Sequence, residues 1–181
     1  MTTLSDYRDE RLRKLAEIRA MGIDPYPAKS HRNTKISTIV DHFDEKDGQE
    51  VCIAGRIMAI RSFGKIAFVK LRDYFGEVQV FMQTVDDIPE GNFGVKQLKL
   101  LDTGDFVEAA GIVGKSSTGE ISVFANSLRL LTKSLRPLPG YDGLTNKEER
   151  YRRRYVDMNV NPEVRERLVR RSKFWQATRD F

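Results

Sequence analysis

The sequence is poor in the residues that form covalent and metal cross-links. Cys52 is the one cysteine among 181 residues, so no disulfide can form within the chain and no cysteine metal cluster is possible. His31 and His42 are the two histidines, too few for a His-based zinc site, and we predict no metal site. Long apolar runs are missing as well, which excludes a membrane helix of about 20 apolar residues.

Most of the chain also has no excess of positive or negative charge. Residues 1–144 contain 20 Lys and Arg against 20 Asp and Glu, whereas residues 145–181 contain 11 against 6. Bulk charge therefore does not predict a nucleic-acid surface on the larger part, and any such surface depends on local arrangement. The first residues, MTTLSDYRDERLRK, mix acids with bases before any apolar stretch. Neither a secretory signal nor a transit peptide is predicted, and we expect a cytoplasmic protein.

From Val51 onward the sequence consists of short apolar runs separated by glycines and acidic turns. Five runs are typical of strands: VCIAGRIMAIR, KIAFVKLRD, EVQVFM, DFVEAAGIVGK and EISVFANSLRLL. Between the third and fourth runs, the apolar residues from Val95 to Leu101 have the spacing of one or two helical turns. Five strands with a helix after the third predict an OB-fold, a partly open five-stranded barrel. A five-stranded barrel of SH3 type is the alternative, but it does not account for the helix.

Helices are expected on both sides of this barrel, so the predicted fold class is mainly β with flanking helices (α+β). Residues 1–50 form a helical extension, whose amphipathic helix carries Leu12, Leu15, Ile18 and Met21 on one face and is followed by Gly22. The OB-fold domain spans residues 51–132.

A change of composition ends the barrel. Residues 133–145 contain two prolines and two glycines and are predicted to be a linker. Residues 146–181 form a further helical segment, in which Asn161 is expected to cap a helix that starts at Pro162. The helical pattern runs to Phe181 without a capping residue, and we expect a longer protein that continues beyond it.

Strand alternation points to one candidate binding face. It places Phe68, Gln79 and Phe81 of the second and third strands on the outer surface, because their neighbours fill the core. Arg61 lies at the first turn, where its side chain can reach a phosphate or a base edge. Aromatic faces stack on bases and an amide pairs with a base edge, so this set suits single-stranded nucleic acid.

Each feature also has a structural interpretation. Phe68 and Phe81 can instead pack under the N-terminal helix or the linker. Lys70, Arg72 and Glu77 are typical of a solvated face with cross-strand ion pairs. The sequence has no Gly-rich phosphate loop, no nucleophile elbow and no catalytic set of carboxylates or histidines. Taken by its residues alone, the chain is predicted to bind a ligand, and no catalytic residue is assigned.

Five segments resemble, in the same order, the N-terminal part of class II lysyl-tRNA synthetases. The resemblance covers the chain from about Arg11 to Phe181. Aspartyl and asparaginyl enzymes share the barrel, but DPYP and the pair LRPLP and YRRRYVDM are similar to the lysyl enzymes. The segments are RLRKLAEIRAMGIDPYP, AGRIMAIRSFGKIAFVKLRDYFGEVQVFM, GDFVEAAGIVGK, SLRLLTKSLRPLP and GLTNKEERYRRRYVDMNVNPEVRERLVRRSKFWQATRDF.

The resemblance implies roles for five residues, because the barrel of that family binds the tRNA anticodon. Phe68 resembles the aromatic residue that stacks on the central anticodon uridine, and Phe81 resembles the second stacking aromatic. Arg61 and Gln79 resemble the residues that read the uridine edge. Ser127 stands where many lysyl enzymes have a glutamate that helps to read the anticodon. Serine can still hydrogen-bond a base, so the resemblance implies anticodon binding with weaker discrimination at one position.

The resemblance further implies the partners and cofactors of a longer protein. The anticodon loop of tRNA(Lys) is the expected partner, and the full-length form is expected to be a homodimer. ATP and Mg²⁺ are implied for that full-length ligase, and no cofactor is expected in this chain. Residues 146–181 resemble the beginning of the class II catalytic domain, whose ATP-binding motifs are expected beyond Phe181, so this chain alone is expected to be inactive. A free-standing OB-fold module that binds single-stranded RNA or a protein is the alternative.

Overall fold

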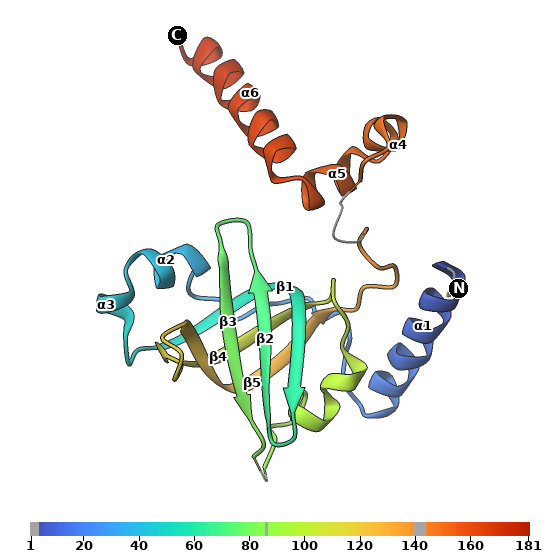
Figure 1. The fold of residues 1–181 in the computed structure, drawn as a ribbon, viewed down its shortest axis with the longest axis vertical. Coiled ribbons are helices and arrows are strands. Elements are labelled where there is room, and N and C mark those ends of the chain that lie inside the picture. Colours follow the sequence, from blue (N-terminus) through green and yellow to red (C-terminus); the bar gives the residue numbers. More distant parts are fainter. Residues whose placement is uncertain (1–3, 86, 140–143) are drawn as a thin grey trace. The chain divides into compact units, whose positions relative to one another are not determined.

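The computed structural model describes residues 4–85, 87–139 and 144–181. The chain divides into two compact units, one that extends to Pro137 and one that begins at Leu138. The first unit contains a β-barrel with helices around it, and the second consists of helices (Figure 1). The predicted linker, residues 133–145, includes residues 140–143, which lie outside the described part.

Five strands form the barrel of the first unit. They are β1 (Glu50–Phe63), β2 (Ile66–Arg72), β3 (Glu77–Gln83), β4 (Phe106–Lys115) and β5 (Ile121–Thr132). The strands close into a barrel in the order β1-β2-β3-β5-β4, and β4 pairs back to β1. All neighbouring pairs are antiparallel except β3 and β5, which are parallel. The five predicted strands are confirmed, and the helix expected after the third is the 3-10 helix η1 (Val95–Leu100).

Alternating side chains fill the barrel as the sequence predicts. Ala67, Val69 and Leu71 of β2 are fully buried. On β3, Val78, Val80 and Met82 are buried in the same core, which turns Gln79 and Phe81 to the outer surface. The period of two thus decides which residues of these strands are available to a ligand.

Strand β1 is long enough to have two partners. Its first half, as far as Arg56, pairs with β4. From Arg56 onward it pairs with β2, with a register shift between Ile57 and Ala59. The second half therefore has one edge without a strand partner, and η1 lies beside that edge (Figure 1). Gly64 makes the β1–β2 turn with a φ of 61°, a left-handed conformation that glycine adopts without strain.

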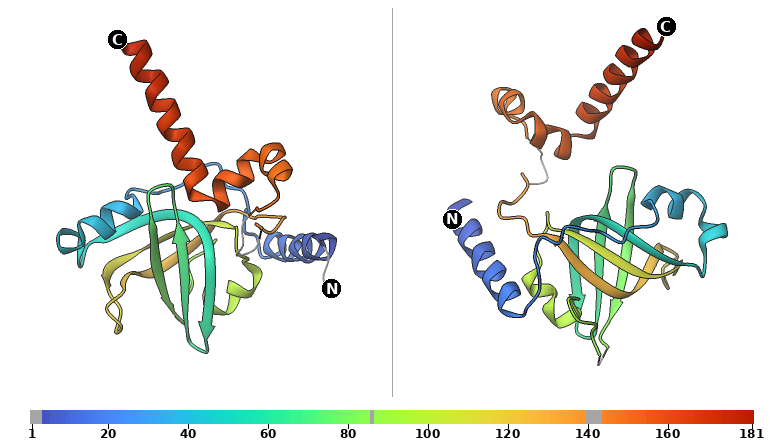
Figure 2. Two further views of the ribbon diagram at one scale, coloured as in Figure 1. Left: turned by 45° about the horizontal axis from the view of Figure 1, so that its top comes forward. Right: turned by 180° about the vertical axis from the view of Figure 1, so that it is seen from behind.

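Helix α1 (Leu4–Ala20) packs against η1. Leu15 and Ile18 form the buried side of α1, as predicted, and both views of Figure 2 show α1 and η1 on the same side of the barrel. Met21 was expected on this face but is exposed, because the helix ends at Ala20 and Gly22 turns the chain with a φ of 77°.

Two short helices, α2 (Ile36–Asp41) and α3 (Phe43–Lys46), lie on the opposite side of the barrel from α1 (Figures 1 and 2). Both lie within residues 1–50, for which a helical extension is predicted.

A buried ionic cluster fixes the loop after η1 to the end of β5. The Lys133 ammonium is fully buried and donates to the Leu100 carbonyl at 2.9 Å, to Asp102 at 2.6 Å and to Asp105 at 2.7 Å. All three of its protons are thus used. Lys14 of α1 also contacts Asp102, at 2.7 Å, so the cluster joins α1 to the barrel.

Arg11 adds a second connection from α1 to the same region. Its guanidinium donates to the Thr103 carbonyl at 2.9 Å and to the Ser134 carbonyl at 3.0 Å, and the residue is 5% exposed. Sequence patterns assign charged side chains to the surface by default, so neither Arg11 nor Lys133 was predicted to be buried.

A second buried carboxylate, Glu108 on β4, holds the connector that precedes α2. Burial alone would raise its pKa, but hydrogen bonds from Arg129, from the backbone and ring of His31 and from Ser30 outweigh this effect. Together they lower the pKa of Glu108 to about 2. The connector residues are thereby fixed to the outer side of β4 and β5.

Because the folded-state pKa of Glu108 lies below its usual value of 4.5, its contribution to stability is present above about pH 4.5 and is lost as the pH falls toward about 2. We expect Glu108→Gln to lower the free energy of unfolding by about 1 kcal/mol at pH 7. The difference from the parent should shrink between pH 4.5 and 2. Urea unfolding over that range measures it, with the exposed Glu120→Gln as control; a difference independent of pH would contradict the assignment.

The second unit contains α4 (Lys147–Arg152), α5 (Arg154–Val160) and α6 (Pro162–Asp180). Helix α6 begins at Pro162 as predicted, but the expected capping hydrogen bond from Asn161 is wrong. The Asn161 side chain donates instead to Asp157 at 2.7 Å, and Asp157 is fully buried beneath Arg150 and Arg154. The Asn161 amide thus adds a third hydrogen bond to a buried carboxylate that also accepts from Arg150 and Arg154.

None of the helices in the described residues has a stretch long and apolar enough to cross a membrane.

Candidate nucleic-acid interface

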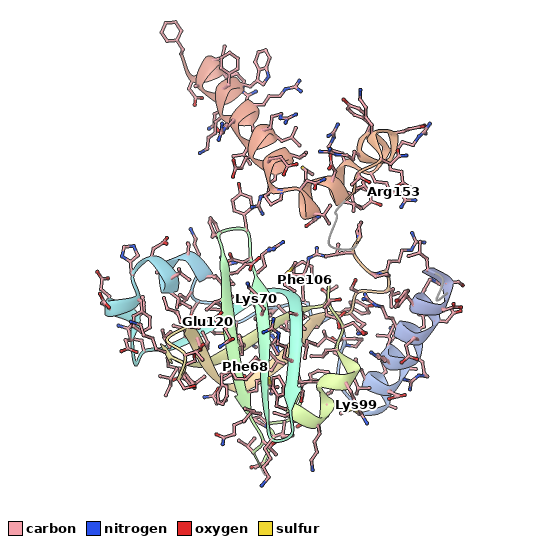
Figure 3. The ribbon with its side chains drawn as sticks, in the orientation of Figure 1. Phe68, Lys70, Lys99, Phe106, Glu120 and Arg153 are labelled. Atoms are coloured by element: carbon pink, nitrogen blue, oxygen red, sulfur yellow. The ribbon has the colours of Figure 1, made fainter. Side chains whose placement is uncertain are left out.

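Cross-strand pairing brings the predicted aromatic residues into one row on the outer face of the barrel. Arg61 of β1 pairs with Phe68 of β2, Phe68 with Phe81 of β3, and Phe81 with Phe124 of β5. The ring centroids of Phe68 and Phe81 are 5.3 Å apart, as are those of Phe81 and Phe124. Figure 3 shows Phe68 near the middle of this face. We call Phe63, Phe68, Phe81 and Phe124 the aromatic row.

Phe63 extends the row at the end of β1. It is 63% exposed, and its ring centroid lies 6.4 Å from that of Phe68 in an edge-on arrangement. At the other end, the ring of Phe124 packs over Gly114, where an added Cβ would lie 3.0 Å from the ring. Four aromatic side chains on four neighbouring strands therefore form a continuous surface that can stack on bases.

Sequence reasoning missed Phe63 and Phe124. Phe63 was available from alternation, because it shares its side of β1 with Arg61. Phe124 was less accessible to that reasoning, since β5 has an irregularity between its pairs with Ala110 and Gly111 that changes the alternation along the strand.

The alternative that Phe68 and Phe81 pack under the N-terminal helix is not supported. Helix α1 packs against η1 at the side of the barrel, and both aromatic side chains remain partly exposed. These rings support each other within the row and leave their outer surfaces to a ligand.

Gln79 lies beside the row, and its orientation is fixed by Ser122. The buried Ser122 hydroxyl donates its single proton to the Glu120 carbonyl at 3.1 Å, so toward Gln79 it acts as the acceptor. The Gln79 amide nitrogen donates to it at 3.0 Å. This hydrogen bond orients the Gln79 side chain, and its amide oxygen remains available to accept from a ligand that donates a proton.

The basic side chains next to Gln79 form ion pairs with an acidic side chain. Glu77 contacts Lys70 at 2.9 Å and also Arg72. Burial raises the pKa of Glu77, but hydrogen bonds from Lys70 and Arg72 outweigh it and lower the pKa overall. The prediction of cross-strand ion pairs is confirmed for these three residues, and Glu77 neutralises one of the two positive charges. Arg61 is exposed and has no ion pair among the described residues, so its charge is available to a ligand.

Ser127 lies apart from the other predicted site residues. It pairs with Ala110 on β4, beyond the β5 irregularity, whereas Gln79 faces Ser122 five positions earlier along β5. The structure therefore brings together Arg61, Phe68, Gln79 and Phe81 and leaves Ser127 farther along the same strand as Phe124.

The sequence was compared with known proteins. Residues 51–131 match the family described as "OB-fold nucleic acid binding domain". The barrel is an OB-fold nucleic-acid-binding domain. This agrees with the strand order and with the helix after the third strand, and the SH3-type alternative is set aside.

The similarity extends over nearly the whole chain. The chain is 43% identical over 175 residues to a lysine–tRNA ligase of Carboxydothermus hydrogenoformans. It is 42% identical over 179 residues to one of Pelotomaculum thermopropionicum. A lysine–tRNA ligase of Clostridium perfringens is 40% identical over 180 residues. These alignments cover 94–98% of this chain and 35% of each relative. The chain thus spans about a third of the length of these relatives, and its sequence is that of a lysyl-tRNA synthetase N-terminal region.

Proposed function

We propose that the aromatic row, with Arg61 and Gln79, binds the anticodon loop of tRNA(Lys). The observation that carries the proposal is the continuous set of four aromatic rings on the outer face of an OB-fold domain, with ring centroids 5.3 to 6.4 Å apart. Stacking on such rings holds single-stranded bases of any identity. Specificity then requires a polar group beside the row, and Gln79 supplies one.

The orientation of Gln79 favours uridine over cytidine. The N3 atom of uridine carries a proton, whereas N3 of cytidine accepts one. An amide oxygen accepts the N3 proton of uridine. Against cytidine, the lone pair of the amide oxygen faces the lone pair of N3, which is repulsive. This supports a role for Gln79 in recognition of uridine, the role that the lysyl-tRNA synthetase resemblance implies.

The whole protein is proposed to be a lysine–tRNA ligase that uses ATP and Mg²⁺. Among the described residues, no group of three or more His, Cys, Asp or Glu side chains could hold a metal ion. No step of the ligation is assigned to the described residues. A homodimeric full-length form and a cytoplasmic location are parts of the proposal that rest on the similarity to the ligases.

A substitution of Gln79 tests the proposed specificity. We expect Gln79→Ala to reduce the preference for a central uridine over cytidine by about 0.5–1.5 kcal/mol, the contribution of one hydrogen bond. Total affinity should fall less, because stacking is kept. Binding of anticodon stem-loops with uridine or cytidine at the centre measures both quantities.

Gln83→Ala is the matched control, because Gln83 is an exposed amide at the end of the same strand. The proposal fails if the parent chain does not prefer uridine. The role of Gln79 is wrong if its substitution and that of Gln83 have the same effect on the preference.

A further inference from the structure

A groove of about 430 Å³ lies between the second half of β1 and η1. Its apolar floor is formed by Ile60 on β1 and by Val95, Leu98 and Leu101 in and after η1. The groove is separate from the aromatic row, because alternation along β1 places Arg61 and Phe63 on the opposite side of the strand from the groove.

The polar rim of the groove is positively charged. Lys96 and Lys99 line it, and both are exposed and without an ion pair among the described residues. In a 3-10 helix, side chains three positions apart are aligned, so both ammonium groups lie on one side of η1. Figure 3 shows Lys99 on η1, beside the β1 edge. The carboxylate closest in sequence, Asp102, is held by Lys14 and Lys133 and does not neutralise them.

The groove continues the aromatic row past the edge of the sheet. Phe63 ends the row on β1 near Arg61, and Ser62 between these two residues lines the groove. The two surfaces thus meet at the free edge of β1, on opposite sides of the strand. An RNA strand that leaves the row beside Arg61 meets the groove next, since η1 lies along this open edge (Figure 1).

We propose that the groove binds the ribose–phosphate backbone of the RNA strand that flanks the stacked bases. Lys96 and Lys99 contact phosphates, and the apolar floor packs against ribose. This inference rests on the proposed function of the aromatic row. It assigns the groove a sequence-independent role, because phosphate contacts fix the position of a strand without reading its bases.

The test is the double variant Lys96→Gln/Lys99→Gln, measured with an anticodon stem-loop at several salt concentrations. Two lost phosphate contacts should reduce the slope of log K against log salt by about 1.4, at roughly 0.7 per contact for a single strand. Affinity should fall by the same factor for central uridine and central cytidine. The double variant Lys29→Gln/Lys46→Gln removes the same charge at positions of the first unit that do not line the groove, and it should leave the slope near that of the parent.

The outcomes separate this inference from the proposed function. If Phe68→Ala weakens binding but the Lys96/Lys99 variant keeps the parent slope, the groove does not bind the RNA backbone and the aromatic row stands. If neither variant weakens binding, both proposals fail. A change of uridine preference in the lysine variant would also overturn the inference, because it would mean that the groove reads bases.

Discussion

Lys133→Met is expected to lower the free energy of unfolding of the barrel unit by about 3–5 kcal/mol, the range for removal of one partner from a buried ion pair. The Lys133 ammonium and the Asp105 carboxylate are both fully buried, 2.7 Å apart. Methionine has a similar length but no charge, so the variant leaves Asp105 buried without its cation. The Leu100 carbonyl also loses its donor, which loosens the end of η1.

Urea unfolding of the 181-residue chain, followed by circular dichroism, measures the loss. Lys65→Met is the matched control at an exposed position and should change stability by no more than about 0.5 kcal/mol. Addition of Asp105→Asn to Lys133→Met should recover part of the loss, because it removes the uncompensated charge. A Lys133→Met variant within 1 kcal/mol of the parent would show that the cluster contributes little.

This cluster shows which features of the fold the sequence could not predict. Alternation and turn residues were sufficient for the strands, because they are local properties. Arg11, Asp105 and Lys133 carry no local sign of burial, since each is buried by partners that are distant in the sequence. Arg11 and Ser134, for example, are 123 positions apart in the sequence. Such pairs become visible when the topology is known.

The candidate site shows the same division. Alternation correctly turned Phe68, Gln79 and Phe81 outward, but it gave no register between strands. The register places Phe124 against Phe81 and Ser122 against Gln79, which extends the row and orients the amide. Alternation alone could therefore indicate a set of surface residues, and the pairing of β3 with β5 was needed to make them one surface.

The ionic cluster and the groove are physically connected. The Lys133 ammonium donates a hydrogen bond to the carbonyl of Leu100 at the end of η1. Lys14 and Lys133 together form ion pairs with Asp102 just after it. A cation pair on a short 3-10 helix is positioned only if the helix itself is fixed. The buried cluster therefore helps to fix the helix that carries Lys96 and Lys99.

Phe68→Ala is expected to weaken binding of a lysine-tRNA anticodon stem-loop by roughly 1–3 kcal/mol, or about 5- to 150-fold. Phe68 lies between Phe63 and Phe81 in the row, so its removal interrupts the stacking surface instead of shortening it. Residues 1–144 have no net charge to supply a long-range attraction. Stacking should therefore dominate the affinity, and the loss should be similar at low and high salt.

Fluorescence anisotropy with a labelled stem-loop measures the loss at two salt concentrations. Phe75→Ala is the control, because Phe75 is an exposed aromatic on the β2–β3 turn whose ring contacts Lys35 and Tyr74 and lies outside the row. Phe68→Trp keeps an aromatic face and should retain most of the affinity, which separates stacking from a general change of the strand. If Phe68→Ala binds as tightly as the parent, or if Phe75→Ala is equally impaired, the aromatic row is not the surface that holds the anticodon.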